Sequence, residues 1–187
     1  MLAAEAVLGR LMEGGRAASD GLDWDALYAD QAPRVYNFFR FRLGSQSEVE
    51  DLTARTFEKA WRSRATYRSE LAAFSTWLFT IARNVAIDHM AARRLHLPLD
   101  DAAHVAAEGT PEQEVERGSD LARLALLTAG LPERERELIA LKYGAGLDNR
   151  LISRLTGLSE SNVGTILHRT VRALRAQWFA DEAADHE

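Results

Sequence analysis

The residues best suited to chemistry are polar and basic side chains near the C-terminal end of the chain. They recur at helical spacing between Ser159 and Gln177, opposite an apolar stripe. The set comprises Ser161, Asn162, Thr165, His168, Arg169 and Arg172. Asparagine and arginine can read the edges of bases, whereas arginines further along a helix suit phosphates. The set therefore indicates DNA recognition rather than catalysis.

Two helices joined by a tight turn are predicted to position these residues. The first spans Asp148–Leu155 and the second Ser159–Gln177, with Gly157 between them. Asp148 and Ser159 are favourable N-caps, and glycine accepts the positive φ that a tight turn requires. This order is typical of a helix-turn-helix, whose second helix enters the major groove. It also fits an ordinary antiparallel helix pair with a polar outer face.

Apolar residues recur at helical spacing along most of the remaining chain, and strand patterns are almost absent. We expect helices at 24–43, at 47–62 beginning with a capping box of Ser47 and Glu50, and in a third segment ending near Arg94. Two more are expected at 120–129 and from Pro132 to about Tyr143.

The charge is unevenly distributed, although the net charge is −5. Residues 95–120 hold seven acidic residues and one basic residue, whereas the helical segments on either side are net basic. We therefore predict an all-α protein of two small helical domains, 23–94 and 120–178, joined by a flexible acidic linker at 95–119, with an N-terminal extension at 1–22 and an acidic tail at 179–187.

Several classes of site are disfavoured. The chain has no cysteine, no apolar run long enough to cross a membrane, and an N-terminus unlike a signal peptide, so we expect a cytoplasmic protein. His89, His96 and His104 are not spaced as ligands on adjacent helical turns, so no metal is expected. No phosphate-binding glycine loop or nucleophile elbow is present, and no enzymatic activity or cofactor is expected.

The C-terminal half resembles region 4 of extracytoplasmic-function (ECF) sigma factors, a branch of the sigma-70 family. The similar segments are LPEREREL at 131–138, LKY at 141–143, GL at 146–147 and LTGLS at 155–159. The N-terminal half resembles region 2 of the same family through EDLT at 50–53, FEKAW at 57–61 and WLFTIARNVAID at 77–88. The two resemblances follow the family's order and spacing.

The resemblance implies a sigma factor that directs core RNA polymerase to promoters and assists promoter melting. It assigns the helix-turn-helix to the −35 promoter element and the polymerase β flap. It assigns the helix at 47–62 to the coiled coil of the β′ subunit, with polar contacts from Glu50, Asp51, Lys59 and Arg62.

The resemblance also assigns the third helix, with the loop before it, to the −10 element. The residues implied are Arg64, Tyr67, Arg68, Trp77, Arg83, Asn84 and Asp88. Trp77 also suits core packing, and Arg83 with Asp88 also suits a structural ion pair. An anti-sigma partner is common in the family, but no residue of this sequence identifies one.

The sequence departs from the family within the second helix of the turn motif. Gly164, Thr165 and Ile166 are uncharged where a basic residue is usual. Glycine inside a helix also costs about 1 kcal/mol relative to alanine. Asn149 and Arg150 stand where an acidic residue is common. We expect weak intrinsic affinity for the −35 element.

Two other classes of protein remain as alternatives. A stand-alone helix-turn-helix regulator is the nearest, and a helical adaptor without a DNA role is the next. The promoter sequence, the regulon, the inducing signal and the roles of the two ends of the chain are not encoded in any recognisable pattern.

Overall fold

The computed structural model describes residues 23–43, 46–96 and 120–184, and the regular structure within these ranges is entirely helical. The first group contains α2 (Trp24–Leu43), α3 (Gln46–Arg62), the short 3-10 turn η1 (Arg64–Thr66) and α4 (Phe74–His96). The second contains α6 (Asp120–Ala129), α7 (Glu133–Ile139), the π-helical turn η3 (Ala140–Gly144), α8 (Asn149–Thr156) and α9 (Glu160–Ala184). The predicted extension at 1–22 and almost all of the predicted linker lie outside the described residues.

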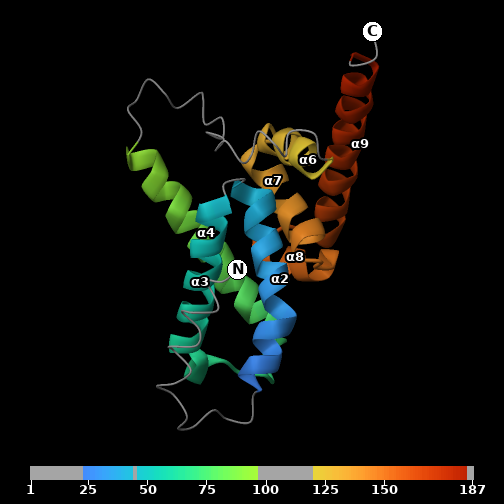
Figure 1. The fold of residues 1–187 in the computed structure, drawn as a ribbon. Helices are drawn as coiled ribbons and strands as arrows, with labels where there is room; N and C mark the ends of the chain where they lie inside the picture. Colours follow the sequence, from blue (N-terminus) through green and yellow to red (C-terminus); the bar gives the residue numbers. More distant parts are fainter. Residues whose placement is uncertain (1–22, 44–45, 97–119, 185–187) are drawn as a thin grey trace.

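Helices α2, α3 and α4 pack around an aromatic core (Figure 1). Phe38, Phe39 and Phe79 are completely buried, and the rings of Phe38 and Phe79 meet edge to face with centroids 6.0 Å apart. Leu52 and Leu78 complete this centre. The apolar stripes of the three helices therefore meet in one place, as their spacing predicted.

The second group forms a smaller core beneath the turn motif. Leu138, Leu141, Ile152 and Val163 are buried there. The π-helical turn η3 ends α7, because Ala145 N–H donates to Ala140 O at 2.9 Å instead of to the carbonyl four residues back. This wider turn brings the chain round to α8.

The two groups pack directly against each other, with α2 lying along α7 and η3 (Figure 1). Gly144 is buried in this contact, and Arg34 Nε donates to Ala145 O at 2.8 Å. The buried apolar residues of both groups form one continuous cluster. The all-helical, two-unit prediction is confirmed, and the close contact between the units is a feature that the sequence did not indicate.

Two helix ends differ from the predictions. Helix α9 runs on to Ala184 instead of ending near Gln177, because residues 178–184 contain three alanines and neither glycine nor proline. The first part of the predicted acidic tail is therefore helical. Helix α3 already includes Gln46, so Ser47 lies inside the helix and not at its cap.

Gly144 gives a test of the contact between the units. A Cβ at this position would lie 2.8 Å from the carbonyl oxygen of Asn37, which belongs to the α2 backbone and cannot retract easily. We expect Gly144→Ala to lower the free energy of unfolding by about 1–3 kcal/mol, as overpacking does elsewhere. Urea denaturation of the variant and the wild type would measure this change in the free energy of unfolding.

Gly130→Ala is the matched control, because its Cβ would meet its nearest neighbour, Leu127 O, at 3.6 Å. Equal stability of Gly144→Ala and the wild type would show that α2 and η3 are not tightly packed.

Candidate nucleic-acid interface

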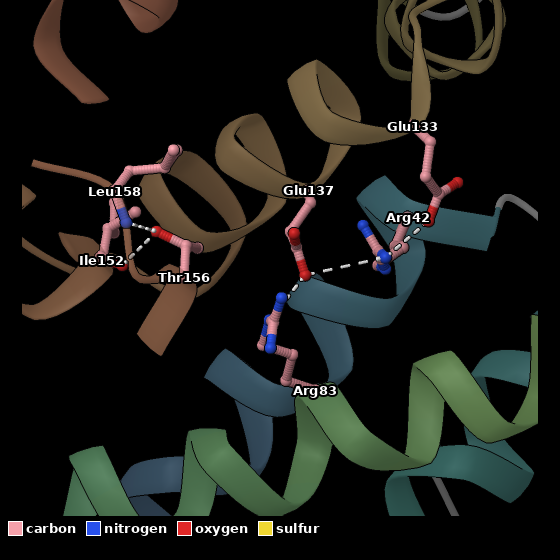
Figure 2. A network of polar contacts seen from close by, with 7 residues as sticks. All are labelled: Arg42, Arg83, Glu133, Glu137, Ile152, Thr156 and Leu158. Atoms are coloured by element: carbon pink, nitrogen blue, oxygen red, sulfur yellow. Dashed lines mark hydrogen bonds and ion pairs between the residues drawn. The ribbon is translucent and has the colours of Figure 1, made fainter. Parts of the chain in front are cut away.

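Side-chain hydrogen bonds fix the turn between α8 and α9. Asp148 Oδ1 accepts from Leu151 N–H at 2.7 Å, and Ser159 Oγ accepts from Asn162 N–H at 3.2 Å, which confirms both predicted caps. Gly157 lies between them with a φ of 75°. Thr156 Oγ1 donates to Ile152 O at 2.8 Å and accepts from Leu158 N–H at 3.4 Å (Figure 2). The orientation of α9 relative to α8 is therefore closely determined.

The polar residues of α9 share one exposed face, as their spacing predicted. Val163, Leu167 and Leu174 are buried on the opposite face. The exposed set is Ser161, Asn162, Thr165, His168, Arg169 and Arg172. A helix that presents such a face after a tight turn has the geometry for entering a major groove.

One member of this face is already engaged. Arg169 Nη2 donates to Glu135 Oε1 at 2.8 Å, and Thr170 Oγ1 donates to Glu135 Oε2 at 3.2 Å. The Arg169 side chain is 71% exposed, so this ion pair contributes under about 1 kcal/mol. A base edge or phosphate can therefore replace Glu135 at little cost.

The residues assigned to the −10 element divide into two kinds on α4. Asn84 and Asp88 are exposed, whereas Arg83 is turned toward the second domain and donates from Nε to Glu137 Oε1 at 2.8 Å. The alternative of an Arg83–Asp88 ion pair is wrong, since Asp88 instead lies 3.3 Å from Lys59 Nζ.

The aromatic members of that set belong to a ring cluster at one end of α4. Tyr67 and Trp77 contact each other and also Phe74, with centroids 5.2–5.6 Å apart. Tyr67 Oη donates to Ala72 O at 3.2 Å, and Trp77 is half-buried. Packing therefore covers part of both rings.

The two arginines of the preceding turn differ in their surroundings. The guanidinium of Arg64 lies over the Trp61 ring, 4.3 Å from its centroid, and Nη1 donates to Trp61 O at 2.8 Å. Arg68 is exposed. Of the two, Arg68 is the more accessible to a phosphate backbone.

The residues assigned to polymerase binding lie along α3. Asp51 is exposed and 3.7 Å from Arg55, Arg62 is exposed and 2.6 Å from Glu58, and Glu50 is partly exposed. Lys59 is also exposed, and its contact with Asp88 joins this surface to the α4 surface. The polymerase-binding and −10 sets therefore adjoin within one domain.

Charged side chains between the two domains were not recognised from the sequence. Glu137 of α7 lies between Arg42 of α2 and Arg83 of α4 (Figure 2). Arg42 Nη2 donates to Glu133 Oε1 at 2.7 Å and lies 3.7 Å from Glu137 Oε1, which accepts from Arg83. We call Arg42, Arg83, Glu133 and Glu137 the interdomain ion cluster. It joins three helices from both halves of the chain.

Arg42 is the most constrained member of the cluster, because only 2% of its side chain is exposed. Burial lowers the pKa of its guanidinium, and the neighbouring Glu137 and Glu133 carboxylates counter this effect. A signal was present in the sequence. Arg42 follows Val35, Phe38 and Phe39 at helical spacing, which places it on the buried face of α2.

Comparison with known proteins decides among the classes left open by the sequence. The family model for Sigma-70 region 2 matches residues 27–95, and that for Sigma-70 region 4 matches residues 121–174. The chain belongs to the ECF sigma factors of the sigma-70 family. It therefore directs RNA polymerase to promoters and binds both core polymerase and promoter DNA. A stand-alone helix-turn-helix regulator is not favoured, because that class of protein would not account for the match to region 2.

Curated relatives resemble this sigma factor over most of their length. The ECF sigma factor BldN of Streptomyces coelicolor is 32% identical over 187 residues, which cover 97% of this chain and 70% of BldN. SigL of Mycobacterium tuberculosis is 30% identical over 165 residues, which cover 86% of this chain and 92% of SigL.

Solved structures share the fold. RpoE of Bartonella quintana, in complex with the anti-sigma factor NepR, gives a TM-score of 0.68 at 22% identity, covering 85% of this sigma factor and 98% of RpoE. CnrH, in complex with the cytosolic domain of CnrY, gives 0.63 at 23% identity and covers 96% and 99% of the respective chains.

No helix in residues 23–43, 46–96 or 120–184 is long and apolar enough to cross a membrane. The same residues include no group of three or more histidine or acidic side chains arranged to hold a metal ion.

Removing one charge tests the interdomain ion cluster. We expect Glu137→Gln to lower the free energy of unfolding by about 1.5–3 kcal/mol, because Arg83 and the buried Arg42 both lose a carboxylate. The exposed Glu70→Gln is the control. Chemical denaturation of both variants measures the difference, and equal midpoints would mean that the cluster does not stabilise the structure.

Proposed function

We propose that the two domains divide the work of promoter recognition. Residues 23–94 bind the β′ coiled coil through Glu50, Asp51, Lys59 and Arg62 and handle the −10 element through α4 and the loop before it. Residues 120–178 bind the −35 element and the β flap. The main support is the exposed polar face of α9, held in place by its capped turn.

Within the −10 set, the exposed side chains give the strongest support for contact with DNA. Asn84 and Asp88 are exposed on α4, and Arg68 is exposed beside it. Capture of unpaired bases needs cations that follow the backbone and ring surfaces for stacking. Arg64, Tyr67 and Trp77 supply these once the strand reaches the ring cluster, and Arg83 joins them when released from Glu137.

The sigma factor acts, in this proposal, in the cytoplasm and catalyses no reaction itself. The polymerase carries out the reaction, and the two helical domains position the polymerase on the promoter. We also propose a protein inhibitor of the anti-sigma class as a partner. The support is that the similar structures RpoE and CnrH were each solved with a bound protein, named as an anti-sigma factor for RpoE.

The contact between the domains must open before both promoter elements are bound. The −10 and −35 positions are about 25 base pairs apart, or roughly 85 Å of B-form DNA. A compact chain of about this length has a radius of gyration near 16 Å and a diameter of only about 40 Å. The packed arrangement is therefore a resting state, and opening it frees Arg83.

Association with polymerase tests the proposed function as a whole. The full chain, mixed with bacterial core polymerase, is expected to co-elute with it and to support initiation from a defined start site on some promoter. Selection from a randomised promoter library provides the template. A chain that footprints duplex DNA alone but never binds core polymerase would contradict the proposal.

The division of labour gives a sharper prediction. Asn84→Ala and Arg169→Ala should each reduce promoter-specific transcription roughly tenfold, as expected for losing a base contact of about 1–3 kcal/mol. Core binding should be unchanged, and Gln177→Ala, exposed elsewhere on α9, should behave as wild type. Loss of core association in either variant would assign that residue to the polymerase surface instead.

A further inference from the structure

A hollow of about 580 Å³ lies between η3, the start of α8 and the middle of α9. Its size is within the range of small-molecule sites. Leu167 and Val171 form an apolar wall, and the ring of Tyr143, which is 54% exposed, forms another. A hollow with such walls can bind a planar apolar group of a ligand as well as an ion.

The polar lining of the hollow is cationic. Lys142, Arg172 and Arg175 border it, together with the His168 imidazole, and no lining residue is acidic. Within the described ranges, Lys142, Arg172 and Arg175 make no ion pair, whereas Arg169 is held by Glu135. Three cations that pair with no described carboxylate and border one concave surface favour an anion.

Gly164 keeps the hollow open. It lies inside α9, where glycine weakens the helix. A Cβ there would meet only Asn149 Nδ2, at 3.5 Å, so packing does not require glycine. Asn149 Oδ1 is buried nearby and accepts no hydrogen bond from the described residues. A ligand with a hydroxyl or N–H group would satisfy it.

We propose that this hollow is a binding site for the phosphate of a nucleotide. Lys142, Arg172 and Arg175 bind the phosphate, while the Tyr143, Leu167 and Val171 surface holds the base or sugar. The nucleotide is a free one, because a DNA phosphate held at this face would be part of the −35 contact already proposed. His168 and Arg172 also belong to the proposed −35 face, so a free nucleotide would compete with DNA there, and this consequence rests on the proposed function.

Binding to the full chain, without DNA or polymerase, tests the site independently of sigma activity. Calorimetric titration with ATP is expected to show binding that adenosine does not reproduce, because adenosine lacks the phosphates. Lys142→Ala and Arg175→Ala should each weaken ATP binding at least fivefold. The control Arg154→Ala removes an exposed charge of α8 that does not line the hollow, and it should leave binding unchanged.

Two substitutions of Gly164 separate a ligand role from a structural one. Gly164→Ala should raise the melting temperature, since alanine favours the helix and has room. Gly164→Leu should fill the hollow and weaken ATP binding at least fivefold without lowering the melting temperature below that of wild type.

The proposal is overturned if ATP does not bind, if adenosine binds as tightly as ATP, or if Arg154→Ala weakens binding as much as Lys142→Ala.

Discussion

Arg42 places a guanidinium in the contact between the two domains, where only 2% of its side chain is exposed and Glu133 Oε1 lies 2.7 Å away. A charge removed from water is tolerated only beside opposite charges that are themselves fixed. Glu133 and Glu137 provide these from α7, and Arg83 of α4 shares Glu137. The position of α7 against α2 and α4 is therefore tied to one buried cation.

A second part of the contact involves the backbone directly. Gly144 brings η3 against the backbone of α2, and Arg34 donates to the backbone of Ala145. Close backbone approach gives little tolerance for sliding of η3 along α2. Opening the domains would return the Arg42 guanidinium to water, so the ion cluster itself opposes opening only modestly. An arrangement of this kind can hold a resting state and still be released by a partner.

Local signals in the sequence predicted local structure well. The caps at Asp148 and Ser159 and the turn at Gly157 depend on neighbouring residues, and all three are present in the structure. The predicted end of α9 was wrong. No glycine or proline interrupts the residues after Gln177, so helix propensity extends the helix to Ala184. The faces of α4 and α9 followed from helical spacing alone, which is why Asn84 and the six polar residues of α9 are exposed as expected.

The partners of charged side chains were beyond such reasoning. Arg83 and Asp88 lie near each other on α4, yet they pair with Glu137 and Lys59, which are distant in sequence. Which charges meet depends on how the domains pack, and that packing depends on side-chain shapes from both halves. The buried position of Arg42 was visible in its helical register, but its carboxylate partners were not.

The distance between the domains tests the central claim most directly. The chain has no cysteine, so Ala65→Cys on η1 and Ala173→Cys on α9, both exposed, give two specific spin-label positions. Double electron–electron resonance should show one narrow distance distribution in the free protein and a longer mean distance after core polymerase is added. The same distance in both states, or a broad distribution in the free protein, would contradict a closed resting state.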